Sequence, residues 1–434
     1  MVQEIGIGIA GLGTVGGGVV EMLRRTRPLI RSVVGADIVI RRVAELDERR
    51  LRALRIGRNI RAGSLEELAR DPDVRIVVEL IGGTSAAHSL VASALRAGKH
   101  VVTANKALIA TRWRSILSLA IRKGCAVGFE ASVMAGVPVI RALEQGLAGN
   151  RIRSILGILN GTSNFIVTRM AEHGEEFAQS LSEARKRGLC EAEASLDVDG
   201  HDAAQKLSIL GSIALGKWLP PALVFREGIR GLEHYDLSEA REEFGYVLRP
   251  LAILKVRDEG VEARVHPTFV PAEHPLAAVS DEFNAALIDC DAAGPIMLTG
   301  KGAGADPAAS GVVSDLIALA RAVAGHERGL PPLPRAPAPG TPAVVPIAEV
   351  ENKFYLRFSV IDKPGVLSYI SGVLGRNGVS IAGCYQRGRS MRGSVPVVMV
   401  THEAREGNVR RALAQIDRAR SIVKRKTVAI RIEE

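Results

Sequence analysis

The first third of the chain alternates between apolar runs and amphipathic segments. Runs rich in apolar residues, typical of buried strands, lie at 4–10, 36–46, 74–83 and 99–106. Segments with apolar residues at helical spacing lie between them, at 64–71 and 86–98. Strands that alternate with helices predict a parallel sheet covered by helices, so we expect an α/β domain here.

The remainder of the chain has a different pattern. From about residue 136 the regular alternation weakens, and longer mixed segments continue to about residue 325. Seven of the 20 prolines then fall within 329–346, which predicts a semi-rigid, extended linker and a domain boundary. Residues 353–434 have the pattern strand, helix, strand, strand, helix, strand. That order predicts a small antiparallel sheet with both helices on one face, the ferredoxin-like arrangement.

The composition is that of a soluble globular protein with two or three domains. The chain has 434 residues, of which 47% are hydrophobic and 24% are charged. No apolar run reaches the length of a membrane span, and the N-terminus lacks a basic segment followed by a signal-like apolar stretch. We therefore expect a cytoplasmic protein with no membrane contact.

The formal net charge of +10 comes mainly from arginines spread along the whole chain. Few aromatic residues accompany them, which argues against a nucleic-acid partner. An anionic cofactor or substrate, or simply a basic surface, fits the charge equally well. The four cysteines are far apart and form no C-x-x-C pair, which argues against structural zinc and against a disulfide framework.

A glycine-rich loop follows the first apolar run. Gly11, Gly13 and Gly16 form the pattern G-x-G-x-x-G, directly after a strand and at the start of a helical segment. The first glycine permits a tight turn, the second lets the backbone approach a pyrophosphate, and the third lets the helix pack on the strand. The helix N-terminus then attracts the phosphates. The loop predicts dinucleotide binding, against the alternative of a glycine turn used only for packing.

Residues near the end of the second strand bear on the choice between NAD and NADP. Glu45 and Asp47 are suited to hold the ribose diol of NAD, whereas Arg49 and Arg50 are suited to hold the 2′-phosphate of NADP. Either pair also fits an ordinary solvent-exposed surface with no ligand. The two signals conflict, and we favour NADP.

Two further strand ends carry small or polar residues. Residues 82–84 (Gly-Gly-Thr) follow the third strand, and Thr103, Asn105 and Lys106 follow the fourth. In open α/β sheets, ligands collect beyond the carboxyl ends of the strands. We therefore expect residues 82–84 to approach a nicotinamide, and Lys106 to lie in the site rather than on an ordinary surface.

The stretch 191–206, EAEASLDVDGHDAAQK, contains five carboxylates and one histidine. A calcium loop would need a third ligand and a distal glutamate that are missing here, and zinc would need another histidine or cysteine nearby. From Asp202 onward the sequence predicts a helix, which places Asp202 and Lys206 one turn apart on one face. The pair is either a surface ion pair or a pair in a cleft, where the carboxylate holds a lysine that gives or takes a proton.

Upstream, Asn160, Gly161 and Thr162 open another helical segment. Backbone N–H groups and hydroxyls at such a start suit the binding of a small carboxylate. The alternative is an ordinary N-cap by Thr162 or Ser163, which such residues often supply. The pattern alone leaves both interpretations open.

An ordered series of motifs resembles those of homoserine dehydrogenases. The motifs are GIAGLGTVG, ELIGG, AGKHVVTANKALIA, FEASVMAGVPVI, LNGTSNFI, DVDGHDAAQKLSIL, ARVHPTFV, HPLAAV, FNA and GKGAGADPAASGVVSDL. The resemblance covers nearly the whole chain, and VIDKPGVLSYISGVL is similar to part of an ACT regulatory domain. It implies the NAD(P)-dependent interconversion of L-aspartate 4-semialdehyde and L-homoserine, in the pathway to threonine and methionine.

The resemblance also implies a domain order. We expect a Rossmann-type dinucleotide-binding domain at 1–135 and a central α+β catalytic, substrate-binding and dimerisation domain at 136–325. A Pro-rich linker at 326–349 and a ferredoxin-like ACT domain at 350–434 follow. Homodimers or homotetramers are expected.

Residue roles follow from the same resemblance. It implies proton transfer by Lys206 and Lys106, with Asp202 one turn before the first. Substrate binding is expected at Glu191, Asp197, Asn160, Gly161 and Thr162. Cofactor binding is expected at Gly11, Gly13, Thr14, Val15, Gly16, Arg49, Gly83, Thr84, Thr103, Lys106 and Gly302. A monovalent cation, Na⁺ or K⁺, is expected at Glu130, Val133, Ala135 and Val137, and an effector such as L-threonine at Gly365, Asn377 and Gln386.

Some positions depart from the family pattern. Glu193-Ala194 replaces an aspartate–proline pair, His201 an apolar residue, and Met134-Ala135 a glycine-rich pair, while Lys301 lies where proline or arginine is more usual. None of these removes a residue that the chemistry needs. Two rival functions are a non-catalytic sensor of redox state and amino-acid level, and a dehydrogenase of the same fold for another small aldehyde or alcohol.

Overall fold

The computed structural model describes residues 2–190, 194–325, 338–386 and 394–434. Within these ranges the chain forms two compact units, each assembled from separate stretches of sequence. The first consists of Met1–Gly161, Asp202–Val224 and Glu282–Pro342, and the second of Thr162–His201, Phe225–Asp281 and Ala343–Glu434. The domain boundaries expected at residues 135, 325 and 349 stay predictions.

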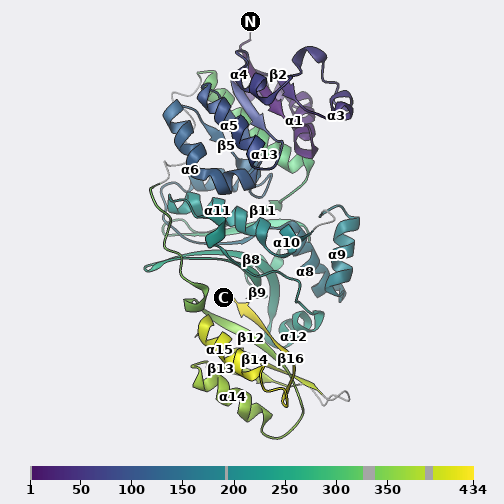
Figure 1. Cartoon of the computed structure of the whole chain (residues 1–434), viewed down its shortest axis with the longest axis vertical. Helices are drawn as coiled ribbons and strands as arrows, with labels where there is room; N and C mark the ends of the chain where they lie inside the picture. Colours follow the sequence, from purple (N-terminus) through teal and green to yellow (C-terminus); the bar gives the residue numbers. More distant parts are fainter. Residues whose placement is uncertain (1, 191–193, 326–337, 387–393) are drawn as a thin grey trace. The chain divides into compact units, whose positions relative to one another are not determined.

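A five-stranded parallel sheet forms the centre of the first unit (Figure 1). Its strands are β1 (Glu4–Ala10), β2 (Asp37–Ala44), β3 (Ile76–Glu79), β4 (His100–Thr103) and β5 (Val127–Gly128), in the spatial order β2-β1-β3-β4-β5. Every pairing in this sheet is parallel, as the sequence predicts. Because β1 lies between β2 and β3, the carboxyl ends of β1 and β3 flank the switch point where such sheets bind ligands.

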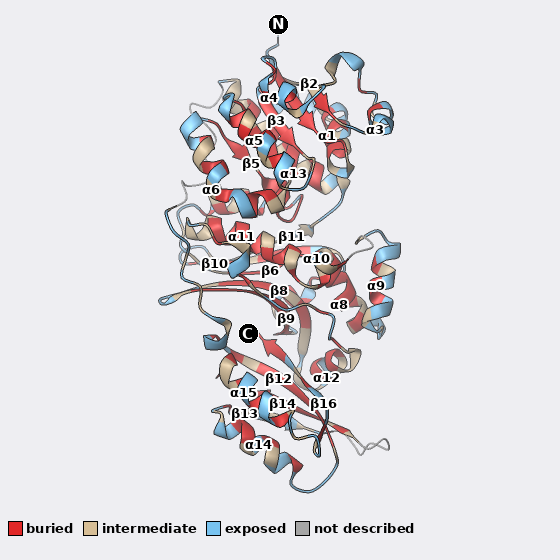
Figure 2. Cartoon of the chain, in the orientation of Figure 1, coloured by how far each residue is buried: buried red, intermediate tan, exposed pale blue. Residues whose placement is uncertain are grey.

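Helices follow these strands and cover the sheet. They are α1 (Thr14–Arg25), α2 (Arg27–Val34), α3 (Glu48–Ala53), α4 (Leu65–Arg70), α5 (Ser85–Arg96), α6 (Lys106–Lys123) and, much later in the chain, α13 (Ala305–Val323). Ile7 and Ile9 of β1 share one buried core with Val312 and Leu316 of α13. Figure 2 shows β1, β3 and β4 mostly as buried, because a parallel sheet is covered on both faces, whereas the edge strand β2 is largely of intermediate burial.

Three antiparallel strands and one long helix complete the first unit. β6 (Ile152–Ile158) pairs with β10 (Phe283–Cys290), which pairs with β11 (Gly294–Lys301). The helix is α11 (His201–Leu215), and α7 (Val139–Arg141) leads into a π-helical turn at Ala142–Gly146. After α11, the Trp218 indole N–H donates to the Ala110 carbonyl of α6, with 2.8 Å between nitrogen and oxygen. This bond fixes the end of α11 against the parallel-sheet part of the unit.

The second unit contains a long antiparallel hairpin. Its strands are β8 (Tyr246–Arg257) and β9 (Gly260–Pro271), and β7 (Phe225–Arg226) and β16 (Val423–Ile432) pair parallel with β9. The helices of this part are α8 (Gly161–His173), α9 (Phe177–Lys186), α10 (Ser195–Val198) and α12 (His234–Phe244). Across the described parts of both units, we find no helix that combines the length and the apolar character needed to cross a membrane.

The C-terminal part of the second unit has the element order that the sequence predicts. Its elements are β12 (Glu351–Val360), α14 (Val366–Arg376), β13 (Ile381–Tyr385), β14 (Val395–Thr401), β15 (Ala404–Arg405), α15 (Glu406–Ile416) and β16. β12 pairs antiparallel with β14 and β16, and β13 with β14. Leu356 and Phe358 of β12 share a core with Ile370 of α14 and Ala412 of α15, so both helices cover one face. That this part is an ACT domain stays a prediction.

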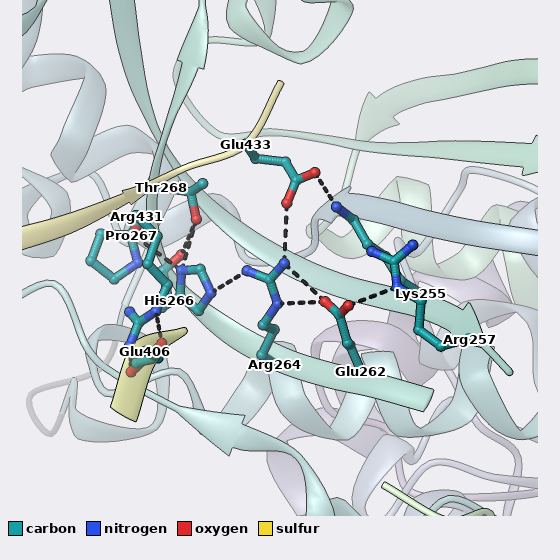
Figure 3. Close-up of polar contacts among 10 residues, drawn as sticks. All are labelled: Lys255, Arg257, Glu262, Arg264, His266, Pro267, Thr268, Glu406, Arg431 and Glu433. Carbon is teal, nitrogen blue, oxygen red and sulfur yellow. Dashed lines mark hydrogen bonds and ion pairs between the residues drawn. The ribbon is translucent and has the colours of Figure 1, made fainter. Parts of the chain in front are cut away.

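A buried network of ion pairs joins the last strand to β9 (Figure 3). Arg264 of β9 is 1% exposed, and its guanidinium lies 3.1 Å from the carboxylates of both Glu262 and Glu433. Arg431 of β16 pairs in the same way with Glu406 of α15. Buried charges are tolerated only when they are paired, so each partner depends on the other. Residues 431–433 therefore belong to the core of this unit and are not a loose tail.

The described part of the proline-rich segment makes backbone hydrogen bonds. The Ala338 N–H donates to the Gly216 carbonyl at 2.9 Å within the first unit. The Val345 N–H donates to the Val261 carbonyl, also at 2.9 Å, within the second. Residues 326–337 of the predicted linker lie outside the described residues.

Candidate functional site

The glycine loop lies at the switch point of the parallel sheet. Gly11 has a φ of 90°, and a Cβ there would lie 2.5 Å from the Leu80 carbonyl oxygen. A Cβ at Gly16 would lie 2.0 Å from the Gly11 carbonyl oxygen. Only glycine fits these two positions, because the backbones approach too closely for a side chain. Since α1 begins at Thr14, directly after Gly13, its free N–H groups lie at the loop, as phosphate binding requires.

The charged residues after β2 are arranged around the same loop. The Glu45 carboxylate accepts the backbone N–H of Leu12 at 2.6 Å. Burial opposes ionisation of Glu45, but the N–H groups of residues 47, 12 and 46 hold its pKa below the ordinary value. Arg50 lies 3.7 Å from Glu45 and 3.8 Å from where a Cβ on Gly13 would be. Arg49, the predicted cofactor contact, is exposed on the same short helix α3.

The ends of β3 and β4 meet in a hydrogen-bonded group that we call the strand-end cluster: Glu79, Gly83, Thr103 and Asn105. The Thr103 hydroxyl donates to Glu79 Oε2 at 2.6 Å and accepts the Asn105 N–H at 3.0 Å. The Asn105 side chain donates to the Gly83 carbonyl at 2.6 Å and is the N-cap of α6. Lys106 is the first residue of that helix. The residues predicted at the two strand ends are thus brought together.

Asp202 connects the two predicted proton-transfer lysines. Lys206 Nζ lies 2.9 Å from Asp202 Oδ2, and Lys106 Nζ lies 3.0 Å from Oδ1. The Asn160 amide donates to Oδ2 at 2.8 Å, and Lys206 also donates to the Leu159 carbonyl at 2.6 Å. Asp202 and Lys206 are only 7% and 8% exposed. The pair on α11 is therefore buried, and the surface alternative does not apply.

Burial and the two lysines set the charge of this group. Burial alone would raise the pKa of Asp202, but the ammonium groups of Lys206 and Lys106 hold it well below its usual range, with help from Asn160. The carboxylate stays ionised at neutral pH and keeps both ammonium groups in place. A lysine held in this way can donate a proton to a developing alkoxide and stabilise its charge. The geometry therefore suits acid–base chemistry at an oxygen.

Of the other predicted substrate residues, Gly161 ends the first stretch of the first unit, Thr162 and Asp197 lie in the second unit, and Glu191 lies outside the described residues. The Thr162 hydroxyl donates to the Leu189 carbonyl at 2.8 Å, and the Ser163 hydroxyl donates to the Asp197 carbonyl at 3.1 Å. These bonds tie the start of α8 to Leu189, just before the acidic stretch, and to Asp197 within it. The role of Glu191 in substrate binding stays a prediction, as does that of Asp197.

Asn284 lies next to two glycines that the sequence places in the site. A Cβ on Gly302 would lie 2.1 Å from Asn284 Cγ, and a Cβ on Gly161 would lie 3.4 Å from Asn284 Oδ1. Asn284 is fully buried, and within the described ranges neither polar atom of its side chain has a hydrogen-bond partner. Because an unpaired buried amide is unfavourable, such a group is a candidate contact for a ligand.

The predicted cation residues surround a strained turn. Met134 and Ala135 have φ values of 55° and 47°, in the left-handed region, and both are buried. A glycine-rich pair adopts this turn freely, so the departure from the family pattern carries a conformational cost. The Glu130 carboxylate accepts the N–H groups of residues 140 and 141 at 2.8 and 2.9 Å. The Val137 carbonyl accepts one N–H at 2.8 Å and keeps a second lone pair.

A small cavity of about 50 Å³ adjoins Glu130 and is also lined by Glu144, Asp315 and Arg141. Glu144 Oε1 is buried, and no hydrogen-bond partner for it occurs among the residues that the structure describes. Burial, reinforced by the charges of Asp315 and Glu130, raises the pKa of Glu144 to about 8. Carboxylate and carbonyl oxygens are the donors that hard cations prefer, but the Arg141 side chain shares this cavity, and the described residues contain no group of three or more acidic, histidine or cysteine side chains that could hold a metal ion. The monovalent cation stays a prediction.

Two of the three predicted effector residues lie far apart within one chain. Gly365 precedes α14 and Asn377 follows it, with the Asn377 amide donating to the Val373 carbonyl at 2.9 Å. A helix of 11 residues separates them by about 16 Å, because each residue adds about 1.5 Å. The effector site predicted from Gly365, Asn377 and Gln386 stays a prediction.

Glu79 and Asn284 are the two site residues that the sequence patterns do not single out. Glu79 has a weak local signal, a carboxylate at the end of an apolar run just before two glycines. Asn284 lies in the motif FNA, but nothing in the sequence shows that it approaches Gly161 and Gly302, which are distant from it along the chain. Their positions become visible only in the folded chain.

Two family models match the chain. The model described as "Homoserine dehydrogenase, NAD binding domain" matches residues 11–130, and "Homoserine dehydrogenase" matches residues 138–317. A homoserine dehydrogenase from Pseudomonas aeruginosa is 39% identical, over 100% of this chain and 99% of that protein. One from Synechocystis sp. is also 39% identical, over 97% of this chain and 98% of that protein.

Solved structures give the same result. A homoserine dehydrogenase from Thiobacillus denitrificans is 38% identical, covers 100% of both chains and superposes with a TM-score of 0.92. A hyperthermophilic archaeal homoserine dehydrogenase in complex with NADPH is 27% identical, covers 76% of this chain and 100% of that chain, and gives a TM-score of 0.62. The resemblance drawn from the motifs is confirmed: the chain belongs to the homoserine dehydrogenase family and contains its NAD-binding domain.

Proposed function

We propose that this enzyme reduces L-aspartate 4-semialdehyde to L-homoserine, reversibly and with NADPH, and that Lys206, Lys106 and Asp202 carry the acid–base chemistry. The observation that carries the proposal is the buried Asp202 carboxylate, which lies 2.9 Å from one lysine ammonium and 3.0 Å from another. Family membership supplies the reaction and the pathway to threonine and methionine.

The glycine loop would hold the pyrophosphate of a reduced dinucleotide, whose nicotinamide would supply a hydride to the aldehyde carbon. The oxygen of that aldehyde then becomes an alkoxide, which needs a proton and a nearby positive charge. Lys206 or Lys106 donates the proton, and the other ammonium stabilises the developing charge. Asp202 holds both lysines, and Asn160 keeps the carboxylate oriented through its 2.8 Å hydrogen bond. In the reverse direction the same lysine accepts the proton from the alcohol.

The charged ends of the amino-acid substrate need separate contacts. Glu191 and Asp197 are acidic and suit the α-ammonium group. The turn at Asn160, Gly161 and Thr162, at the start of α8, suits the α-carboxylate. Fixing both ends positions the aldehyde against the ring, which lowers the barrier by orientation alone.

A continuous absorbance assay of NAD(P)H oxidation with aspartate semialdehyde tests the proposal directly. Turnover that prefers this α-amino acid over simple aldehydes such as propanal is the expected result. A sensor would bind the cofactor without turnover. A dehydrogenase for another substrate would show no preference for the amino-acid aldehyde.

The choice of NADP rests on the arginines after β2. Arg50 borders the glycine loop, and Arg49 is exposed beside it on α3. Glu45 is already occupied by backbone N–H groups, including that of Leu12 in the loop, so it is less free to bind a ribose diol. A comparison of kcat/KM for NADPH and NADH tests this part. A preference for NADH would overturn it.

A monovalent cation, Na⁺ or K⁺, is proposed at Glu130, Val133, Ala135 and Val137. The turn at residues 134 and 135 is strained, and the neighbouring Glu144 Oε1 is buried and unpaired within the described ranges. Thermal unfolding in NaCl, KCl and tetramethylammonium chloride at equal ionic strength tests the site without relying on turnover. Equal melting temperatures in all three salts would contradict it.

We expect feedback by L-threonine through the C-terminal βαββαβ part, and an assembly of two or four chains. Gly365 and Asn377 lie at opposite ends of α14, so a site that uses both needs a second copy of this part. Titration of L-threonine in the assay, with light scattering to measure mass, tests both ideas together. No inhibition at about millimolar threonine would leave the C-terminal part with an assembly role. A cytoplasmic location stays a prediction.

A further inference from the structure

Glu79 is a fully buried carboxylate at the carboxyl end of β3. It lies opposite Thr103 in the register of β3 and β4, and Thr103 is fully buried as well. A buried carboxylate is unfavourable unless several donors surround it. Its presence at this end of the sheet therefore calls for a structural or functional reason.

The donors around Glu79 come from two different turns. The Thr103 hydroxyl, from the end of β4, donates to Oε2 at 2.6 Å. The Ile81 N–H, from the turn after β3, donates to Oε1 at 3.0 Å. Each oxygen thus holds one turn, and the carboxylate joins them. Burial raises the pKa of Glu79, although hydrogen bonds from Thr103 and from residues 81, 82 and 105 oppose that rise.

Thr103 also connects Glu79 to the start of α6. Its oxygen accepts the Asn105 N–H at 3.0 Å, so its own hydroxyl proton is left for Glu79. Asn105 accepts the Leu108 N–H at 3.0 Å as the N-cap of α6, and its amide donates to the Gly83 carbonyl at 2.6 Å. The bonds close a ring from β3 through β4 and α6 back to the turn after β3.

This ring of hydrogen bonds fixes the position of Lys106. This lysine is the first residue of α6, directly after the N-cap Asn105. Its ammonium then reaches Asp202 on α11, 3.0 Å away. A shift of the α6 start would move Lys106 relative to Asp202 and Lys206, and errors of about 1 Å in such positions cost about a hundredfold in rate.

We propose that Glu79 is a positioning residue for the reaction: through Thr103 and Asn105 it fixes the start of α6 and hence Lys106, and through Ile81 it fixes the turn that approaches the nicotinamide. This inference rests on the proposed role of Lys106 in proton transfer. It assigns to Glu79 no contact with substrate.

The test compares matched variants at both ends of the 2.6 Å bond. Glu79→Gln keeps the size but replaces one acceptor oxygen by a donor, so it cannot hold both turns. Thr103→Val keeps the shape and removes the hydroxyl, whereas Thr103→Ser keeps the hydroxyl. We expect Glu79→Gln and Thr103→Val each to lower kcat at least about tenfold, and Thr103→Ser to retain most of it. The double variant should be no worse than the poorer single one, since both break one connection.

A second comparison separates positioning from general damage. In a Lys106→Ala background, Glu79→Gln should lower kcat by a clearly smaller factor than in the parent, because the lysine that it positions is gone and only its hold on the turn after β3 remains to be lost. Affinity for ADP-ribose 2′-phosphate, which lacks the nicotinamide, should stay within about twofold in Glu79→Gln, because the glycine loop is not part of the ring. Thermal unfolding of every variant checks that the chain folds.

Two results would overturn the inference. One is near-normal kcat in a folded Glu79→Gln or Thr103→Val variant. The other is an equal loss from Glu79→Gln with and without Lys106, which would make the effect independent of that lysine. If Glu79→Gln does not fold, Thr103→Val and Thr103→Ser decide the question. Failure of the proposed reaction is distinct, since the unaltered enzyme would then show no turnover with aspartate semialdehyde.

Discussion

Asp202 and Lys206 form a buried ion pair one turn apart on α11, with 2.9 Å between carboxylate and ammonium. The other carboxylate oxygen holds Lys106 at 3.0 Å. One buried anion therefore organises two cations that come from different elements of the first unit. In the proposed mechanism, this arrangement lets one lysine donate a proton while the other keeps positive charge next to the reacting oxygen.

Removal of the Lys206 ammonium should slow the chemical step. We expect Lys206→Ala to lower kcat at least about a hundredfold, the usual scale for lost acid–base help, while the cofactor still binds. Steady-state kinetics together with cofactor titration by nicotinamide fluorescence measure the two effects. Lys217→Ala is the matched control, because Lys217 is exposed just beyond the same helix. Near-normal turnover of Lys206→Ala would remove this lysine from the mechanism.

Asp202 should also matter for stability. Asp202→Asn leaves the 8%-exposed Lys206 without its counter-ion, and breaking a buried pair costs about 3 kcal/mol. The folded-state pKa of Asp202 is depressed, so its contribution is present above the unfolded value of 3.8 and is lost as pH falls below it. Urea unfolding should therefore show a large difference between variant and parent at neutral pH and a smaller one in acid. A difference that does not depend on pH would contradict this account.

Gly302 should tolerate no side chain. A Cβ there would lie 2.1 Å from the buried Asn284 amide, so Gly302→Ala must displace either the loop or the amide. Overpacking of this kind costs about 1–3 kcal/mol, and we expect kcat/KM to fall at least about tenfold. Gly149→Ala, where a Cβ meets open space, is the control for an alanine in place of glycine. If Asn284→Ala/Gly302→Ala recovers both stability and activity, Asn284 has no role beyond packing.

Much of the fold could be predicted because local pattern and tertiary structure agree. β1, β3 and β4 are short apolar runs that the parallel sheet buries on both faces, whereas the edge strand β2 is only partly buried. The C-terminal βαββαβ order is equally regular. By contrast, β9 buries Glu262, Arg264 and His266 in the middle of a strand, which hides its apolar character. These residues partly pair with one another, but Arg264 also needs Glu433, which is far away in sequence, so no local pattern reveals the complete network.

The candidate site, too, could be predicted from the sequence only in part. The spacing of Asp202 and Lys206 on one helix is visible in the sequence, but whether the pair is buried is not. The Lys106 contact to Asp202 joins two helices from different parts of the chain, and only the fold supplies it. Glu79 was missed because a single carboxylate at a strand end has many possible roles. Glu191, the residue expected to bind the substrate ammonium, lies outside the described residues.

Cofactor preference should follow the two arginines on α3. If Arg49 holds the 2′-phosphate, Arg49→Ala should lower kcat/KM for NADPH about tenfold, the value of one charged hydrogen bond, and leave NADH nearly unchanged. Arg50→Ala should act in the same direction, because Arg50 borders the glycine loop. Arg52→Ala, exposed on the same helix, is the control. An unchanged NADPH-to-NADH ratio in both Arg49→Ala and Arg50→Ala would place the discrimination elsewhere.

His266 should make the second unit sensitive to mild acid. It is 1% exposed, and its Nε2 lies 3.0 Å from a guanidinium nitrogen of Arg264, which can only donate, so the ring is held neutral. Burial, together with the charges of Arg431 and Arg264, lowers the pKa of His266 well below its ordinary 6.5. In mild acid, His266 therefore binds a proton in the unfolded chain but not in the folded chain.

The consequence of this difference is a loss of stability as pH falls below about 6.5, with a slope approaching 1.4 kcal/mol per pH unit from this one group. His266→Gln keeps a hydrogen-bonding side chain and should flatten that slope in urea unfolding between about pH 7.5 and 5.5. His402→Gln, at an exposed position, should leave the slope as it is. Equal slopes for the parent and His266→Gln would show that His266 takes up its proton in the folded state, and that the network in Figure 3 accommodates the additional charge.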